Sequence, residues 1–145
     1  TAVVFDMDHT EGTYAAAELL HECFERVVVM TPREGIAHDT ALVTRQGILR
    51  RFHRMGIDIL PHCEPRWSEA FESQSRLAYE HVYSGAISAI DDVAFFAYAT
   101  PRAPETGLLE PLQALGLPVR RVGDCRVARG VLAATAEGHA AGLAL

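Results

Sequence analysis

The stretch VVFDMDHTEG, Val3 to Gly12, decides the fold, and it can be interpreted in two ways. Three apolar residues lead into Asp-x-Asp-x-Thr, a pattern typical of the nucleophile loop of phosphate-transferring enzymes. The same letters fit the first strand and turn of a nucleotide-binding β-α-β unit whose glycines are replaced by carboxylates. The rest of the chain has to separate these two interpretations.

The composition narrows the class of protein. The sequence has 145 residues, of which 49% are hydrophobic, and a net charge of −6, which together predict one compact domain in the cytoplasm. No window approaches 18 consecutive apolar residues, and the net negative charge does not predict a broad basic surface. We therefore expect neither a membrane nor a nucleic acid as partner. The absence of lysine excludes every mechanism that needs a Schiff-base or phosphate-binding lysine.

Cysteine and histidine spacing predicts no metal site. The three cysteines lie far apart without a C-x-x-C motif and are interpreted as small buried apolar residues; they are Cys23, Cys63 and Cys125. The seven histidines have no partner at the spacing of zinc ligands. The chain opens at Thr1 and enters a strand within two residues, which favours a fragment of a longer polypeptide.

Hydrophobic periodicity indicates the order of secondary structure. A β-branched run at 2–5, apolar residues at helical spacing over 16–24 and a buried run at 27–30 predict a β-α-β unit. An apolar stripe predicts a helix over 40–55, and Gly56 stands where a helix end favours a left-handed residue. 

The remaining expected elements alternate between strands and helices. They are a strand at 57–60, antiparallel ribbon over 63–83, a buried strand at 93–98, a short helix at 105–115, a strand at 119–122 and a closing helix at 127–143, with loops at 84–89 and 100–106. The fold class is therefore α/β: a parallel sheet flanked by helices, interrupted by an antiparallel β excursion.

The phosphotransferase interpretation assigns chemistry to both carboxylates of the opening stretch. FDMDHT resembles the first motif of the haloacid-dehalogenase family, in which Asp6 would attack phosphorus, Asp8 would act as acid and base, and magnesium would bridge carboxylate and phosphate. Thr31, after the second strand, could bind phosphate. The later motifs fit less well, since no lysine is present and Asp124 has no second carboxylate at the expected spacing. This interpretation stays as the alternative.

The dinucleotide interpretation uses more of the chain. On that template Asp6 and Asp8 stand where glycines are expected, and only Gly12 survives, one position late. Two carboxylates beside a pyrophosphate would repel it. The sequence thus retains the pattern of the β-α-β fold but lacks most of the glycines that would bind phosphate.

Four stretches extend this interpretation in collinear order over nearly the whole chain: FDMDHTEGTYAAAELL, VVVMTP, ILRRFHRMGIDILP and RRVGDCRVARGVLAATAEGHAAGLAL. Together they resemble the C-terminal nucleotide-binding region of the trimethylamine and dimethylamine dehydrogenase group. That group includes 2,4-dienoyl-CoA reductase and is built on an old-yellow-enzyme barrel. Acidic residues in the first turn, as at Asp6 and Asp8, are familiar in some of its members.

The resemblance implies that residues 1–145 form one Rossmann-like FAD/NAD(P)-binding domain, the nucleotide-binding domain of a multidomain flavin-dependent oxidoreductase. Residues 1–117 would be the NAD(P)- or ADP-like lobe, holding ADP or NAD(P)H, and residues 118–145 a remnant of an FAD-like lobe, which would hold FAD together with its missing half. The active site, with FMN and in many members an iron–sulfur cluster, would lie in a barrel domain outside this sequence. We therefore expect no catalytic residue and no metal ligand here, and as partners a nucleotide, the barrel domain and a second copy of the chain.

Two pairs of residues complete the expected cofactor site, beside Asp6 and Gly12. Thr31 and Arg33 follow the second strand, where an acidic residue normally grips the adenosine ribose and where an arginine suits a 2′-phosphate. The alternative is that Thr31 caps a turn and Arg33 is a solvated arginine. Gly123 and Asp124 would direct an amide and a carboxylate to FAD, or else Asp124 only caps the last helix.

Overall fold

The computed structural model describes residues 1–144 and divides into two compact units, Thr1–Pro101 and Arg102–Leu145. We call them the N-terminal and the C-terminal unit and describe each by itself. Among the described residues, none of the helices combines the length and hydrophobicity that crossing a bilayer demands.

A four-stranded parallel sheet forms the centre of the N-terminal unit, in the order β3-β2-β1-β7. Its strands are β1 (Ala2–Asp6), β2 (Val27–Met30), β3 (Asp58–Leu60) and β7 (Phe95–Ala99). Every residue of β1 and β2 is buried, as expected for apolar strands covered on both faces. The predicted strand at 93–98 is found as β7, but it is partly exposed because it lies at the edge of the sheet.

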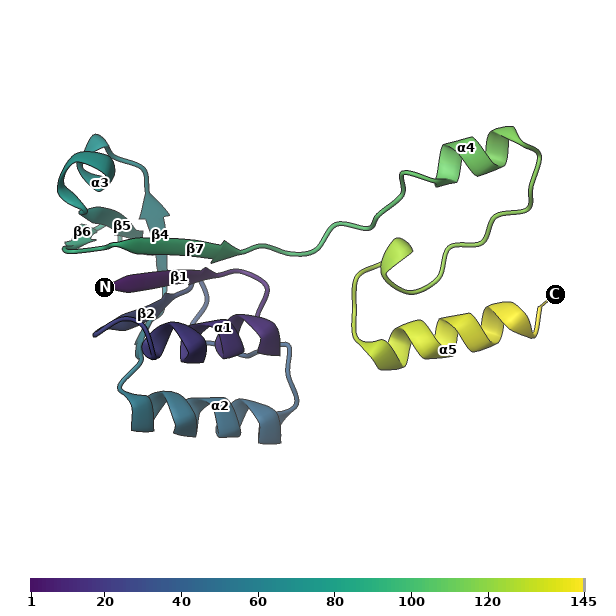
Figure 1. Ribbon diagram of the computed structural model, residues 1–145. Coiled ribbons are helices and arrows are strands. Elements are labelled where there is room, and N and C mark those ends of the chain that lie inside the picture. The colour runs from purple at the N-terminus through teal and green to yellow at the C-terminus, as the bar shows by residue number, and fades with distance from the viewer. Residues whose placement is uncertain (145) are drawn as a thin grey trace. The chain divides into compact units, whose positions relative to one another are not determined.

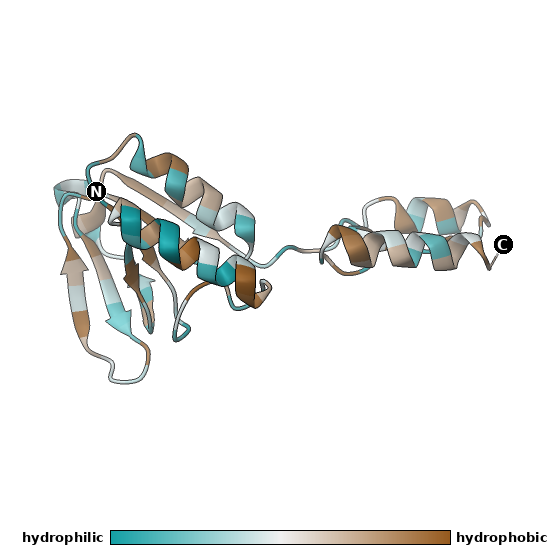
Figure 2. Cartoon of the chain, turned by 90° about the horizontal axis from the view of Figure 1, so that it is seen from below, coloured by the Kyte–Doolittle hydropathy of each residue, from teal (hydrophilic) through white to brown (hydrophobic). Residues whose placement is uncertain are grey.

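Two amphipathic helices, α1 (Glu11–His21) and α2 (Leu42–Met55), cover one face of this sheet (Figure 1). Hydrophilic and hydrophobic bands alternate along the helices of this unit (Figure 2). The apolar residues pack on alternate residues of β1 and β2 and form a core cluster that includes Val4, Val29, Tyr14, Ala17, Ile48 and Phe52. Gly56 ends α2 at φ 72°, which confirms the predicted left-handed end.

An antiparallel sheet covers the opposite face of the parallel sheet, in the order β4-β5-β6 (Figure 1). Its strands are β4 (Cys63–Arg66), β5 (Leu77–His81) and β6 (Ile87–Ile90). The predicted antiparallel ribbon is thus confirmed, but the short helix α3 (Glu69–Gln74) interrupts it. The predicted loop at 84–89 is wrong in part, because Gly85, at φ 69°, closes a tight turn and lets β6 pair with β5.

The C-terminal unit contains α4 (Leu109–Ala114), the 3₁₀ turn η1 (Gly123–Cys125) and α5 (Val131–Gly142). Both predicted helices are present, although the last one begins at Val131 and not at 127. The strand expected at 119–122 does not form among the described residues, since no described strand pairs with it. Large apolar side chains of this unit are exposed, among them Leu108, Leu115, Val131, Leu132 and Leu143.

Candidate nucleotide site

The strand order reverses between β1 and β7. From β1 the chain adds β2 and β3 on one side, and then returns to add β7 on the other side. In open parallel sheets, ligands bind outside the carboxyl ends of the strands where the order reverses in this way. The turn that leaves β1 is joined to β7 there, because the amide of Met7 donates to the carbonyl of Ala99 at 3.0 Å.

Asp6 ends β1 with its carboxylate inside the protein and not at the surface. The side chain is 0% exposed. Its Oδ1 accepts from the amide of His9 at 2.9 Å, and its Oδ2 accepts from the hydroxyl of Tyr14 at 2.7 Å. The same hydroxyl accepts from the amide of Ala37. Burial and the Asp6 carboxylate raise the pKa of Tyr14, so the hydroxyl keeps its proton and remains a donor.

His9 is a buried member of the site that we did not predict. Its backbone is left-handed, at φ 53°, a conformation for which histidine is several-fold enriched among non-glycine residues. Its Nδ1 lies 3.6 Å from Oδ2 of Asp6, and its Nε2 lies 3.3 Å from Oγ1 of Thr31. Burial lowers the pKa of His9, which Asp6 opposes in part. The only sequence signal was its position between two turn-forming residues, which is too common to single it out.

Asp8 lies at the amino end of α1, where the turn would meet a phosphate. Its Oδ1 accepts from the amide of Thr10 at 3.0 Å and from the hydroxyl of Thr13 at 2.7 Å, while its Oδ2 accepts from the hydroxyl of Thr10 at 2.9 Å. Gly12 lies inside the first turn of α1 and is exposed. A Cβ on Gly12 would meet only Oγ1 of Thr10, at 3.9 Å, so packing does not require a glycine there.

Thr31 and Arg33 lie beside this turn, after β2. Thr31 is fully buried, and its hydroxyl accepts from the amide of Arg33 at 3.3 Å, so it does cap a turn as the alternative proposed. Arg33 is exposed and lies 3.6 Å from the carboxylate of Asp39. Further along the same loop, Nε2 of His38 lies 3.3 Å from Nη2 of Arg45 in α2. The structure thus brings together Asp6, Thr31 and Arg33 around His9, with His38 beside it.

Gly123 and Asp124 belong to the C-terminal unit. Gly123 has φ 58°, and a Cβ there would lie 3.1 Å from Cβ of Ala134, so both backbone conformation and packing favour glycine. Its amide donates to Glu137 at 2.8 Å, and Arg126 and Arg129 bind the same carboxylate. These donors, the Gly123 amide first, hold the pKa of Glu137 below its usual value.

The expectation that Asp124 lies at a strand end before a helix is wrong. Asp124 lies within η1, and the residue before α5 is Gly130, so Asp124 does not cap that helix either. Its Oδ1 instead lies 3.5 Å from the amide of Arg129, within the same loop. The physical reason is the bond from Gly123 to Glu137, which ties residues 123–130 into a compact turn against α5.

No observation favours the phosphotransferase interpretation. A nucleophilic Asp6 would need an oxygen open to the substrate, whereas both of its oxygens are buried and accept hydrogen bonds. Within residues 1–144, no group of three or more His, Cys, Asp or Glu side chains could hold a metal ion. Two of the three cysteines, Cys23 and Cys125, are exposed, so the expectation that all three are buried is wrong; only Cys63 is buried.

Solved structures show what this fold resembles, although no protein-family model and no curated protein matches the sequence. The 6-hydroxypseudooxynicotine amine oxidase of Pseudomonas geniculata N1 has a TM-score of 0.83 and 20% identity, covering 97% of this chain and 21% of that one. Histamine dehydrogenase of Rhizobium sp. 4-9 has a TM-score of 0.78 and 22% identity, covering 97% and 22%. A 2-naphthoyl-CoA reductase has a TM-score of 0.78 and 17% identity, covering 99% and 21%.

The matched regions run along nearly the whole chain but span only about a fifth of each of these three proteins. The predicted likeness to the amine dehydrogenase and dienoyl-CoA reductase group is thus confirmed for the fold, as is the α/β class with its parallel and antiparallel sheets. The chain has the α/β fold of one region of these larger oxidoreductases.

Proposed function

We propose that this chain is the nucleotide-binding region of a multidomain flavin-dependent oxidoreductase. The observation that carries the proposal is the reversal of strand order between β1 and β7, since open parallel sheets bind nucleotides in a crevice at the carboxyl ends of such strands. The likeness to three larger oxidoreductases along nearly the whole chain supports it. Residues 1–117 would form the ADP or NAD(P)H lobe and residues 118–145 part of an FAD lobe; the observed units divide earlier, after Pro101.

The adenosine end of the crevice fits its ligand better than the phosphate end does. No acidic residue stands among Met30, Thr31, Pro32 and Arg33, at the end of β2, to bind a ribose diol. Arg33 is exposed and can reach a 2′-phosphate, with its partner Asp39 competing for it. At the phosphate end, Asp8 already lies on the amino terminus of α1. The lobe therefore selects its nucleotide chiefly through adenosine and its ribose substituent.

The bond-making chemistry belongs to groups outside this chain. FMN, and an iron–sulfur cluster if the enzyme has one, would be held by the barrel domain. FAD would need the other half of its lobe, and the Gly123 amide that would face it is bound to Glu137 in this structure. The role of these residues is to bind and orient a nucleotide, and none of them is assigned a catalytic step. We also propose that the exposed apolar side chains of the C-terminal unit pack against the rest of the flavoprotein or a second copy, in the cytoplasm.

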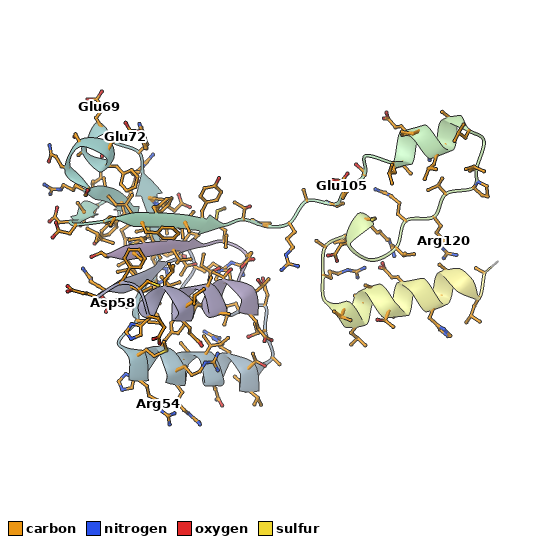
Figure 3. The ribbon with its side chains drawn as sticks, in the orientation of Figure 1. Arg54, Asp58, Glu69, Glu72, Glu105 and Arg120 are labelled. Carbon is orange, nitrogen blue, oxygen red and sulfur yellow. The ribbon has the colours of Figure 1, made fainter. Side chains whose placement is uncertain are left out.

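Isothermal titration calorimetry of the 145-residue chain with ADP, NADH and NADPH tests this function. We expect all three to bind, and NADPH to bind about tenfold more tightly than NADH through the charge-assisted contact of Arg33 with the 2′-phosphate. Arg33→Gln should remove the preference. Arg54→Gln is the matched control, because Arg54 lies on the outer side of α2 (Figure 3).

The possible results separate the two parts of the proposal. If none of the three nucleotides binds, the nucleotide-binding function is wrong. If NADH and NADPH bind equally well, nucleotide binding stands and the role of Arg33 is wrong.

A further inference from the structure

Asp8 occupies the position at which the first turn of a dinucleotide fold binds phosphate. Its two carboxylate oxygens accept hydrogen bonds from the Thr10 amide, the Thr10 hydroxyl and the Thr13 hydroxyl. Thr13 is itself 6% exposed, so this donor is fixed by the core. The carboxylate therefore lies at the start of an 11-residue helix, where a nucleotide phosphate would otherwise bind.

The turn that carries Asp8 is also anchored to the core by buried hydrogen bonds, which restrict movement of Asp8. Asp6 accepts from the amide of His9, the residue that follows Asp8, and His9 is buried against Thr31. Tyr14, one residue beyond Thr13, donates to Asp6 from the same helix. Both ends of the turn are thus hydrogen-bonded to the buried carboxylate of Asp6, and this fixes the position of the Asp8 carboxylate between them.

We propose that Asp8 is a specificity-determining residue that excludes nucleotide phosphates from the amino end of α1. The negative charge of a phosphate would meet the negative charge of Asp8 at the point where both seek the same amide and helix terminus. The lobe then recognises the adenosine end and gains little from a pyrophosphate. This inference rests on the proposed function for its nucleotide, but the exclusion itself is a property of the turn.

The test removes the negative charge of Asp8 with a substitution that keeps the size and shape of its side chain. Asp8→Asn retains an oxygen for the Thr10 and Thr13 donors and removes the repulsion. The matched control is Glu11→Gln, which removes one carboxylate from the first turn of α1 at an exposed position. Each protein is titrated calorimetrically, at fixed ionic strength, with adenosine, ADP and inorganic pyrophosphate. Asp8→Ser provides a second neutral variant in case Asp8→Asn folds poorly by circular dichroism.

We expect the neutral variants at position 8 to bind ADP and pyrophosphate about tenfold more tightly than the parent chain, with adenosine changed by less than about twofold. Glu11→Gln should change all three affinities by less than about twofold. Unchanged or weaker binding of ADP and pyrophosphate by both folded variants would overturn the inference. If adenosine and ADP fail to bind any protein while pyrophosphate still gains, the proposed function fails and the exclusion by Asp8 stands.

Discussion

The hydroxyl of Tyr14 donates to the carboxylate of Asp6 at 2.7 Å while it accepts from the amide of Ala37. One buried oxygen thereby connects the end of β1, the second turn of α1 and the loop that leads into α2. All three residues are 0% exposed, so no water can replace either bond. This contact, more than any exposed charge, sets the geometry of the turn.

Removing the hydroxyl oxygen of Tyr14 should lower the free energy of unfolding considerably, although it deletes a single atom. Tyr14→Phe leaves the Ala37 amide without an acceptor and Asp6 without one donor, and we expect the free energy of unfolding to fall by about 3 kcal/mol. Chemical denaturation followed by circular dichroism measures the change. Tyr98→Phe is the control, because Tyr98 is 69% exposed, and it should change stability by less than about 0.5 kcal/mol. A loss below 1 kcal/mol for Tyr14→Phe would contradict the importance of this contact.

His9 should make stability depend on pH below neutrality. Burial lowers its pKa from the ordinary value of 6.5, so the folded chain binds fewer protons than the unfolded chain just below that pH. Its contribution is complete above about pH 6.5 and is lost as the pH falls through the lowered pKa, by at most about 1.4 kcal/mol per pH unit. Asp6 and Asp39 oppose the shift, while Arg33 and His38 add to it.

Denaturation curves between pH 7.5 and pH 5 measure this dependence. His9→Asn, which tolerates the left-handed backbone, should flatten the slope, whereas His53→Gln on the exposed face of α2 should leave it unchanged. The same slope in all three proteins would show that His9 does not titrate on unfolding.

The cysteines should differ sharply in reactivity. Burial raises the pKa of Cys63 and shields its thiol, while Cys23 and Cys125 are exposed. A chromogenic disulfide reagent should therefore titrate two thiols in the native chain and a third only after denaturant is added. Cys63→Ala should remove the thiol that reacts only after denaturant is added and leave the two that react in the native chain. Three thiols reacting at one rate would contradict the burial of Cys63.

Two glycines, one inside α2 and one directly after its end, should respond to alanine in opposite directions. Gly56 has φ 72° with open space around a Cβ, so Gly56→Ala adds only backbone strain and should destabilise by about 1 kcal/mol. Gly47 lies inside the helix, where a Cβ would meet Arg51 at an ordinary 3.6 Å, and Gly47→Ala should stabilise by up to about 1 kcal/mol. Thermal unfolding of both variants decides this, and a change of the same sign in both would contradict it.

Local pattern was sufficient to predict much of the N-terminal unit. The apolar runs at 2–5 and 27–30 are buried on both faces, and the stripe that ends at Gly56 is a helix, because each signal depends on residues close in sequence. Helix α3 was missed, since six residues are too few to show a helical period against a surrounding strand pattern.

The site was predicted only in outline, for a related reason. Sequence spacing indicated Asp6 and Thr31 as site residues, but not that His9 would lie between them. The bond from Tyr14 to Ala37 joins residues 23 positions apart, and that from Gly123 to Glu137 joins residues 14 apart. Such partners depend on how the elements pack, which no local period records.

The two strands that flank the central strand β1 come from distant parts of the sequence. Ala2 lies opposite Val27 on one side and Phe95 on the other. During synthesis on the ribosome, β2 is available early, whereas β7 is made only after the whole antiparallel sheet, about 4 to 14 s later at usual elongation rates. Throughout that interval the β7 side of β1 is an open, apolar strand edge, which is the kind of surface that pairs with other chains. Between the synthesis of Met30 and that of Ala99, the nascent chain is therefore most exposed to pairing with other chains.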